Sequence, residues 1–332
     1  MLLIDSIYVN MGGGMSLLKY LVETLREKGV KFRLLVDVRA EGQFVDVEDR
    51  LVLPPSEATR YKFYKAFPQD VTSVFCFGNV PPPVKLNVPV YTYFHNINML
   101  TLSDACGWKQ KIKFFLKREY IRSLRDNTDK WFVQTSNTAN ELISHLGVLE
   151  SKVKLFPFYR APKLSELSDE RADYIFVGED TGNKGHEELL LAWSKLREVG
   201  VNSVLHLTVS SKSALYPKIQ NLINNGVRII NHGIIPFDEL IKVYSTCKAT
   251  VYPSPNESFG LGVVEAMELG CDVIAPDLPY IHSICKPSEV FESGNSNSIL
   301  AAVVKYERGC SYKTEQIVQN EILGLIQTLL DK

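Results

Sequence analysis

The sequence predicts two doubly wound α/β domains, each a parallel sheet with helices on both faces. The chain has 332 residues, which suits two domains of about 150 residues each. Short apolar runs alternate with helical patterns, and these runs are continuous in Val, Ile, Leu and Phe, as in strands buried on both faces. The alternation restarts after about residue 160, beyond a segment rich in Pro, Ser and charged residues.

The apolar runs predict the strands of both sheets. They are MLLIDSIYV, KFRLLVDV, VTSVFCFG, VPVYTYFH and KWFVQTS in the first half, and ADYIFVG, SVLHLTVS, VRIINHG, ATVYPS and DVIAPD in the second. We expect an N-terminal domain over residues 1–157, a linker over 158–172, a C-terminal domain over 173–312, and a helix in 313–332 that can cross back to the first domain. Ligands of such sheets bind beyond the carboxyl ends of the strands, so we expect the site in a cleft between the domains.

Composition and charge exclude several classes of protein. A hydrophobic content of 45% is ordinary for a globular enzyme, and a net charge of −1 gives no general attraction to nucleic acid. The six cysteines show no CxxC spacing, which predicts free thiols in a reducing cytosol. The first residues, MLLIDSIYV, contain Asp5 and predict a buried strand rather than a signal peptide, and the sequence has no run of about 20 apolar residues. We therefore expect a cytoplasmic protein, either soluble or peripherally bound to a membrane.

A strand, three glycines and a helix follow one another in YVNMGGGMSLLKYLVETL. This order is typical of a phosphate-binding loop. Gly12 and Gly14 supply the first pair of a GxGxxG fingerprint and Asp37 ends the second strand, but Leu17 stands at the third glycine position. Three interpretations stay open: a redox dinucleotide, another phosphate ligand such as a nucleotide-sugar, or a tight turn.

The second half contains two glutamates eight positions apart in VYPSPNESFGLGVVEAMELGCDVIAPDLPYIHSI. We expect Glu257 in the loop after a strand and Glu265 early in the helix that follows. The backbone N–H groups of residues 258–261 would then point from the helix N-terminus at a ligand, where an anion is favoured. Two carboxylates beside such a site fit hydroxyl groups at the two ends of a sugar-bearing ligand. The alternative is that they only stabilise the helix dipole.

The segment NESFGLGVVEAMELGCDVIA resembles the glutamate–seven–glutamate motif of the retaining GT-B glycosyltransferases of group 1. YIFVGEDTGNKGHEELLLAW is similar to the family's strand, loop and Lys–Gly helix start, and NHGIIPFDELIKVYSTCKATVYPS to the segment leading into its motif. NMGGGMSLLKYLVETL fits the family's glycine loop. The resemblance is strong over residues 174–285 and loose over 1–150. It implies two Rossmann-like domains facing each other across a cleft, and sugar transfer from a nucleotide-diphosphate sugar.

The resemblance also implies roles for individual residues. Glu265 would bind the ribose hydroxyls of the donor, Glu257 the hydroxyls of the transferred sugar, and Lys184 the leaving diphosphate, whose charge must be stabilised. The other expected donor contacts are main-chain groups: Gly12, Gly13 and Gly14 at the diphosphate, Gly233 and Ile235 at the base, and Ser258, Phe259, Gly260 and Leu261 at the sugar and diphosphate.

One feature departs from the family pattern. An arginine usually follows the glycine that ends the first C-terminal strand, but here Gly178 precedes Glu179 and Asp180. Two acids would repel a diphosphate, so either the pair points away or another cation substitutes. Lys212 is the first candidate for that cation and Arg160 a weaker one. Without it, the protein would bind its donor weakly or be inactive.

The stretch YTYFHNINMLT ends a strand and then turns, which places His95 at the lip of the expected cleft. The resemblance implies a histidine near the donor sugar and the acceptor, where imidazole could position the acceptor or share its proton. The alternative is a histidine that caps a loop through its ring nitrogens. Asn96 and Asn98 are further candidates for contacts with hydroxyl groups.

Retention of configuration requires either two displacements or attack from the front face. Glu257 is assigned to the sugar hydroxyls and is a poor nucleophile, so the family implies front-face attack in which the leaving phosphate takes the acceptor's proton. The expected catalytic residues are therefore His95, Glu257 and Lys184. No DxD lies inside an apolar run, the nearest match being VDVEDR, so we expect no metal and no other cofactor.

Residues 107–130, GWKQKIKFFLKREYIRSLRDNTDK, form a basic segment with aromatic residues. Such a helix suits the anionic inner face of a membrane and a lipid-linked acceptor. The alternatives are a solvated helix with a buried aromatic side and a groove for an acidic glycan. The candidate residues for membrane or acceptor contact are Trp108, Lys109, Lys111, Lys113, Lys117, Arg118 and Arg122.

Three functions stay open at this point. The first is a retaining glycosyltransferase that moves a hexose-type sugar to a glycan or lipid-linked acceptor, in cell-surface polysaccharide or glycolipid synthesis. The second is a nucleotide-sugar epimerase on the same fold. The third, which the two acids after Gly178 favour, is a non-catalytic nucleotide-sugar binder or partner subunit.

Overall fold

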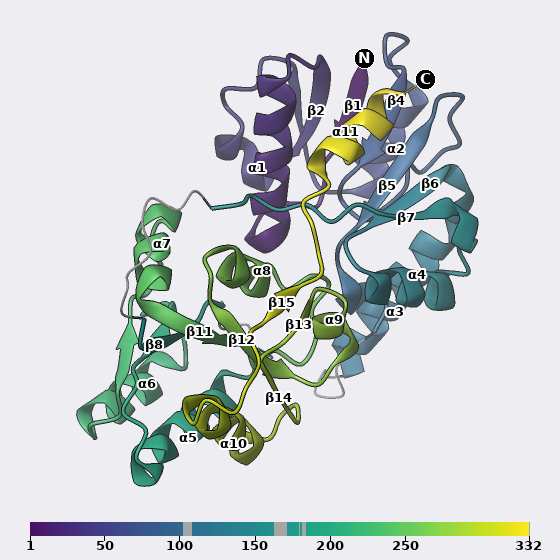
Figure 1. Cartoon of the computed structure of the whole chain (residues 1–332). Coiled ribbons are helices and arrows are strands. Elements are labelled where there is room, and N and C mark those ends of the chain that lie inside the picture. Colours follow the sequence, from purple (N-terminus) through teal and green to yellow (C-terminus); the bar gives the residue numbers. More distant parts are fainter. Residues whose placement is uncertain (102–107, 163–170, 179, 181–183, 332) are drawn as a thin grey trace. The chain divides into compact units, whose positions relative to one another are not determined.

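The computed structural model describes residues 1–101, 108–162, 171–178, 180 and 184–331. The chain divides into two compact units, Met1–Arg160 with Gln319–Lys332, and Ala161–Val318 (Figure 1). The first unit extends to Arg160 because Phe158 and Tyr159, which the sequence assigned to a linker, are buried in its core. The rest of that expected linker lies mostly outside the described residues.

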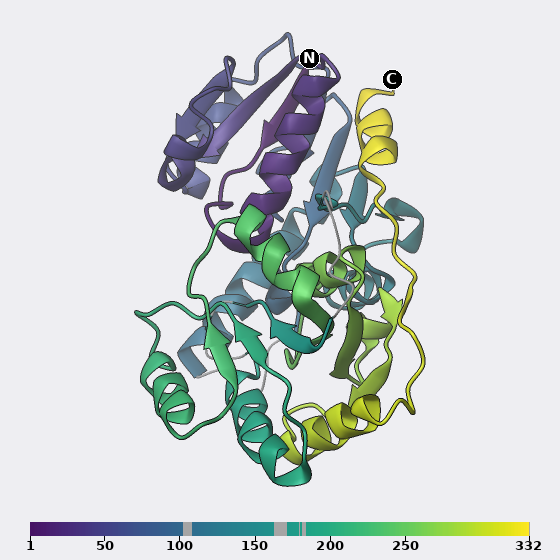
Figure 2. The same cartoon turned by 60° about the vertical axis from the view of Figure 1, so that its left-hand side comes forward.

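The first unit is a parallel sheet flanked by helices (Figures 1 and 2). In the part of it that the structure describes, the strands pair in the order β3-β2-β1-β4-β5-β6-β7, all parallel. The order reverses between β1 and β4, which confirms a doubly wound fold. In chain order its main elements are β1 (Leu2–Asp5), α1 (Gly12–Glu27), β2 (Phe32–Asp37), β3 (Arg50–Leu53), α2 (Glu57–Lys65), β4 (Ser73–Cys76), β5 (Val90–Phe94), α3 (Trp108–Ser123), β6 (Lys130–Val133), α4 (Ser136–Leu146) and β7 (Val153–Leu155).

The second unit repeats this architecture. Its parallel sheet has the order β10-β9-β8-β11-β12-β14 over the described residues, and the order reverses between β8 and β11. A short antiparallel pair, β13 (Cys285–Lys286) with β15 (Glu315–Gln316), lies outside that sheet. The other elements are β8 (Asp173–Phe176), α5 (His186–Leu196), β9 (Leu205–Leu207), α6 (Tyr216–Asn224), β10 (Ile229–Asn231), α7 (Phe237–Thr246), β11 (Cys247–Val251), α8 (Leu261–Glu268), β12 (Asp272–Pro276), α9 (Pro279–His282), β14 (Glu289–Phe291) and α10 (Ser296–Glu307).

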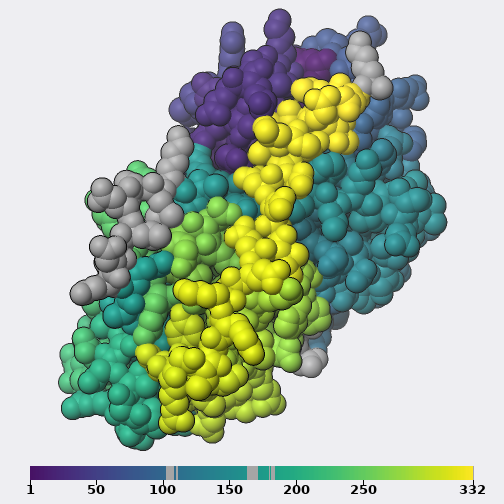
Figure 3. Space-filling model, viewed as in Figure 1, coloured from purple at the N-terminus to yellow at the C-terminus, as the bar shows by residue number. Residues whose placement is uncertain are grey.

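The C-terminal helix α11 (Ile322–Leu330) belongs to the first unit (Figure 3). The Ser73 hydroxyl on β4 donates to the carbonyl of Leu329 at 3.2 Å, and the amide of Asn320 donates to the carbonyl of Tyr159 at 2.5 Å. The expected helix from about residue 313 is wrong in its first half, because β15 forms there and pairs with β13. No helix among the described residues is long and apolar enough to cross a lipid bilayer.

A buried ion pair joins β1 to α2 in the first unit. Asp5, at the end of β1, and Arg60, on α2, are each 1% exposed. The Asp5 carboxylate accepts hydrogen bonds from Nε and Nη2 of Arg60 at 3.0 and 2.9 Å, and from the Tyr64 hydroxyl at 2.8 Å. Arg60 Nη2 also donates to the carbonyl of Val80, after β4, at 3.0 Å. The guanidinium therefore holds together the carboxyl ends of the two strands where the order reverses.

We expect Asp5→Ala to destabilise the first unit by about 3–5 kcal/mol, because it leaves a buried guanidinium without its counter-charge. The matched control is Asp70→Ala, which removes an ion pair whose acid is 57% exposed and should cost no more than about 1 kcal/mol. Urea unfolding followed by fluorescence would measure both, since the buried Trp131 reports on this unit. Equal transition midpoints for the two variants would contradict the assignment.

Candidate functional site

The candidate residues of the second unit gather beyond the carboxyl ends of β8 and β11, where the strand order reverses. Glu257 follows β11, and its Oε1 accepts hydrogen bonds from the hydroxyls of Tyr252 at 3.0 Å and Ser254 at 2.9 Å. The same oxygen pairs with the ammonium of Lys184, from the loop after β8. The family resemblance implies separate roles for Lys184 and Glu257, whereas the structure brings them together as an ion pair. The Glu257 side chain is only 15% exposed.

Gly185 explains how Lys184 reaches this loop. Its φ of +73° lies in the left-handed region that favours glycine. A Cβ atom at this position would lie 2.5 Å from the carbonyl oxygen of Pro253, which directly follows the end of the β11 region. Only glycine therefore lets the start of α5 approach the loop after β11 closely enough for the Lys184–Glu257 pair to form.

Glu265 lies on α8, which begins at Leu261 as expected, with Gly260 at its N-cap. Within the described residues the Glu265 carboxyl has no hydrogen-bond or ion-pair partner. Burial raises the pKa of Glu265 to about 7. Glu265 is the fifth residue of this helix, just beyond its first turn. A buried, unpaired carboxyl of this kind is a candidate for ligand binding, because structural carboxyls are normally paired.

The remaining donor candidates of this unit offer main-chain groups. Ser258, Gly260 and Leu261 lie at the start of α8, while the Phe259 side chain is only 3% exposed and is packed inside the unit. Gly233 follows β10 with a φ of +69°. The Ile235 side chain packs against the core cluster that includes Leu240 and Tyr244. All of these residues lie at the carboxyl edge of the same sheet.

Arg160 and Lys212, the two cations expected to replace the missing arginine, lie in different surroundings. Arg160 is ion-paired with Glu23 inside the first unit, so it is not a free cation there. Its substitution for the missing arginine stays a prediction. Lys212 is exposed in the loop between β9 and α6. Its neighbour Ser213 donates to Asp180 at 2.5 Å, which joins that loop to the one after β8. Glu179 lies outside the described residues.

In the first unit, the three glycines form the first turn of α1 rather than a loop before it. Gly12 has a φ of +64°, and both Gly12 and Gly13 are exposed. Gly14 lies against His95, since a Cβ atom at Gly14 would come within 2.8 Å of Cε1 of the ring. The absence of a side chain at Gly14 thus makes room for His95.

His95 follows β5 and is held by the loop after β4. Its Nε2 lies 2.9 Å from the carbonyl oxygen of Phe77, and the rings of these two residues stack with centroids 4.9 Å apart. Asn79 Nδ2, a donor, lies farther from Nε2, at 3.3 Å. The shorter contact with a carbonyl that can only accept favours the tautomer with the proton on Nε2, which leaves Nδ1 as an acceptor. Burial lowers the pKa of His95 to about 4. The imidazole is therefore neutral at pH 7, and the main-chain N–H donates to Asn79 Oδ1 at 2.7 Å.

The basic segment forms α3, and its apolar residues divide between two faces. Ile121 is buried in the core, whereas Trp108, Ile112, Phe115 and Leu116 are 50–69% exposed. These four recur at helical spacing and share one stripe. The interpretation of a solvated helix with its whole aromatic side buried is therefore wrong. Lys109 and Lys113 flank the stripe on one side and Lys111 on the other, where Arg118 and Arg122 are ion-paired with Glu119. Lys117 lies on the opposite face of the helix.

The first unit contains a cavity of about 490 Å³ that the sequence did not predict. It lies beyond the carboxyl ends of β1 and β4, and its lining includes Tyr8, Arg39, Glu57, Asn96, Lys117 and Tyr120. The only feature of the sequence that could have indicated this cavity is that Tyr8 and Arg39 follow predicted strands, where ligands of such sheets bind.

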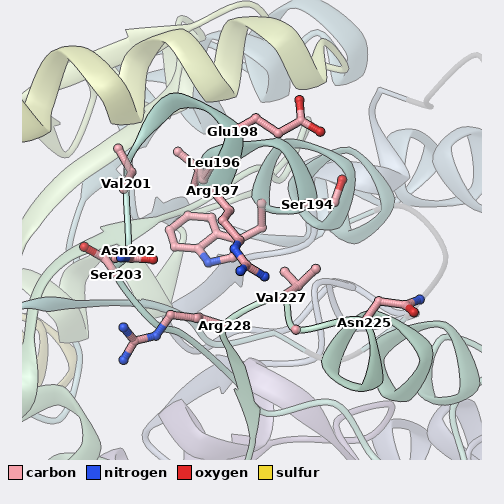
Figure 4. A pocket seen from close by; sticks show the side chains of 12 residues that line it. Ser194, Leu196, Arg197, Glu198, Val201, Asn202, Ser203, Asn225, Val227 and Arg228 are labelled. Atoms are coloured by element: carbon pink, nitrogen blue, oxygen red, sulfur yellow. The ribbon is translucent and has the colours of Figure 1, made fainter.

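A smaller cavity of about 330 Å³ lies in the second unit (Figure 4). Arg197, Asn202 and Arg228 line it, and they precede β9 and β10 rather than following them. It therefore opens at the amino edge of the sheet, away from Glu257 and Glu265. Among the described residues of both units, no three His, Cys, Asp or Glu side chains are grouped to hold a metal ion. Independence from metal stays a prediction.

The raised pKa of Glu265 makes stability depend on pH. A carboxyl whose pKa rises from 4.5 to about 7 on folding binds more protons when folded, so it lowers the free energy of unfolding as pH increases between these values. We expect Glu265→Gln to be more stable than the natural protein at pH 8, by at most about 3 kcal/mol, and equal to it near pH 4.5. Melting temperatures across this range would test this, with the exposed Glu187→Gln as control. A difference independent of pH would contradict it.

Comparisons with known proteins extend over both units. The chain is 31% identical over 218 residues to the O-antigen chain mannosyltransferase RfbU of Salmonella typhimurium, covering 64% of this chain and 58% of RfbU. It is 29% identical over 196 residues to the uncharacterized glycosyltransferase MJ1178 of Methanocaldococcus jannaschii, covering 58% and 50%. The matches thus span less than two thirds of the length of these relatives.

Similarity of fold covers nearly the whole chain. The apo form of the lipopolysaccharide outer core galactosyltransferase WaaB aligns with a TM-score of 0.69 at 13% identity, over 99% of this chain and 95% of WaaB. This likeness identifies two Rossmann-like units of the GT-B fold. Residues 160–320 match the family model described as glycosyl transferases group 1. Over these residues, in the second unit, the chain matches the group 1 glycosyltransferase family, and the fold of both units is GT-B.

Proposed function

We propose that the protein is a retaining glycosyltransferase that moves a hexose-type sugar from a nucleotide-diphosphate sugar to a glycan or lipid-linked acceptor. The proposal rests on one observation, which is that Glu257, Lys184 and the unpaired Glu265 lie at the carboxyl edge where the strand order of the second unit reverses. A role in cell-surface polysaccharide or glycolipid synthesis is supported by the similarity to RfbU, an O-antigen chain mannosyltransferase.

The hydrogen bonds of Glu257 fit a sugar-binding carboxylate. Oε1 takes the contacts with Lys184, Tyr252 and Ser254, while Oε2 has no partner among the described residues. Oε2 is therefore available to accept hydrogen bonds from hydroxyls of the transferred sugar. The Lys184 ammonium has three N–H donors, so the bond to Glu257 leaves two for the leaving diphosphate. Glu265 would accept from the ribose hydroxyls.

The proposed reaction proceeds by front-face attack. The acceptor oxygen forms its bond to the anomeric carbon on the side from which the diphosphate leaves, and a phosphate oxygen takes the acceptor's proton. Lys184 and the N–H groups of residues 258–261 stabilise the charge on the leaving group. The neutral His95, with Nδ1 as an acceptor, holds an acceptor hydroxyl in place rather than supplying a charge. No step requires a metal ion.

Nucleotide binding and transfer can be separated by mutation. We expect nucleoside diphosphates to raise the melting temperature of the natural protein, because they bind only the folded state. Glu265→Gln should abolish this shift, since the ribose loses its carboxylate. Glu257→Gln should keep the shift but lower transfer at least about 100-fold, because its role is to position the sugar.

Glu187→Gln is the control and should match the natural protein in both assays. Transfer should continue in EDTA, and the anomeric coupling constant of the product, measured by NMR, should show retention. Rescue by manganese after EDTA would refute metal independence, and an inverted product would refute retention. Release of an altered sugar nucleotide without an acceptor would indicate an epimerase instead.

We further propose that α3 attaches the protein to an anionic membrane surface. Its exposed stripe of Trp108, Ile112, Phe115 and Leu116 would enter the headgroup region, and the flanking cations would meet lipid phosphates. Each such cation contributes about 1 kcal/mol near an anionic bilayer. A basic apolar face of this kind suits a lipid-linked acceptor better than a free glycan.

Vesicle binding tests this attachment through a single tryptophan. Trp108 is 69% exposed, whereas Trp131 and Trp193 are buried, so a blue shift of the emission on adding vesicles reports on Trp108. We expect the shift with phosphatidylglycerol vesicles but not with phosphatidylcholine, and we expect it to fade with salt. Phe115→Ala should weaken binding, while Leu323→Ala, an exposed residue on α11, should not. Binding that ignores salt would refute the proposal.

A further inference from the structure

The cavity of the first unit has a rigid polar wall built around Glu57. The Tyr8 hydroxyl donates to Oε1 at 2.5 Å and the Tyr120 hydroxyl to Oε2 at 2.6 Å. Arg60 Nη1 lies 3.2 Å from Oε1 and thereby offsets the charge of the carboxylate. Because each tyrosine hydroxyl donates its hydrogen bond to Glu57, each hydroxyl oxygen can only accept a hydrogen bond from a ligand in the cavity. This wall is suited to the hydroxyl groups of a sugar.

The lining also contains two basic side chains, Arg39 and Lys117. Arg39 follows β2, and its Nε and Nη2 donate to Asp37 at 2.9 and 2.6 Å, which fixes the guanidinium while its side chain stays 49% exposed. Lys117 comes from α3 and has no carboxylate partner among the described residues. Burial, together with the charges of Lys113 and Arg39, lowers the pKa of Lys117. Two basic side chains from separate elements thus line one cavity: Arg39, which is paired with Asp37, and Lys117, which has no acid partner among the described residues.

The position of the cavity relates it to His95 within the same unit. Gly78 and Asn96 line the cavity. Gly78 is next to Asn79, whose Oδ1 accepts a hydrogen bond from the His95 main chain, and Asn96 directly follows His95. Tyr8 and Asn79 both have positive φ values, +83° and +69°, which are strained for residues other than glycine. Strain of this kind is tolerated where side chains must be held in a set orientation, and these two residues flank the point where the strand order reverses.

We infer that this cavity binds a phosphate-bearing sugar, with the phosphate between Arg39 and Lys117 and the sugar hydroxyls along Tyr8, Glu57 and Tyr120. A phosphate monoester carries nearly two negative charges at pH 7 and three acceptor oxygens, so it can engage two cations that come from different elements. A neutral glycan would leave Lys117 without a counter-charge. That this sugar is the acceptor rests on the proposed function, but the binding of the phosphate does not.

Titration calorimetry on the full chain at low salt tests the inference, with glucose 1-phosphate as the probe. We expect glucose 1-phosphate to bind at least tenfold more tightly than glucose, and more tightly than glucuronic acid, which carries a single charge. Lys117→Gln should weaken its binding about tenfold or more, since a charged hydrogen bond is lost. Lys113→Gln is the matched control. It removes the same charge one turn away on α3, outside the cavity lining, and should change affinity less than twofold.

Equal effects of the two lysine variants would mean a general electrostatic attraction and would overturn the site, as would equal binding of glucose. Melting temperatures would show that both variants fold. A decyl ester of the same phosphate distinguishes the sources. It is a diester with a single negative charge, so weaker binding than glucose 1-phosphate indicates a soluble monoester, whereas equal or tighter binding shows that the chain adds affinity and indicates a lipid-linked ligand. The rise in melting temperature with nucleoside diphosphates depends on the second unit. If this rise is absent while glucose 1-phosphate still binds, only the donor site is refuted. If the rise is present while glucose 1-phosphate does not bind, only this cavity is refuted.

Discussion

The buried pair of Asp5 and Arg60 is the constraint on which the first unit depends. Burying two charges costs desolvation energy, so such a pair adds little to stability compared with apolar residues of the same size. It does, however, fix positions. Arg60 reaches Asp5 at the end of β1, the main chain after β4, and Glu57 at the start of α2. The wall of the cavity, and with it the orientation of Tyr8 and Tyr120, follows from this single guanidinium.

In the second unit a carboxylate, rather than a guanidinium, is the central charged group that fixes the positions of its neighbours. Here a partly buried carboxylate, Glu257, is the centre, and a lysine from the neighbouring loop approaches it where Gly185 leaves space. In each unit the polar centre lies at the strand-order reversal, where two loops diverge and leave room for side chains. One repeated fold thus presents a carboxylate bound to a cation at two equivalent edges, with different groups left free for ligands.

The sequence predicted the central strands of both sheets correctly, because strands buried on both faces form continuous apolar runs. It missed β3, β7 and β14, which lie at or near sheet edges, are three or four residues long and are partly exposed, so their composition resembles that of loops. The motif around Glu257 and Glu265 was recognisable because its residues are close in sequence. The Lys184–Glu257 pair and the lining by Arg39, Glu57 and Lys117 were not, since these residues look like ordinary surface charges until the fold brings them together.

The pKa of about 7 at Glu265 also has a calorimetric consequence. At neutral pH a fraction of the molecules carries a proton on this carboxyl, and a ligand whose hydroxyls donate to the ionised form must displace it. Binding would then release a fraction of a proton per site, which the buffer absorbs. The heats of binding measured in phosphate and in Tris would therefore differ. The difference equals the number of protons released multiplied by the difference between the ionisation enthalpies of the two buffers, so an enthalpy measured in a single buffer includes a contribution from that buffer.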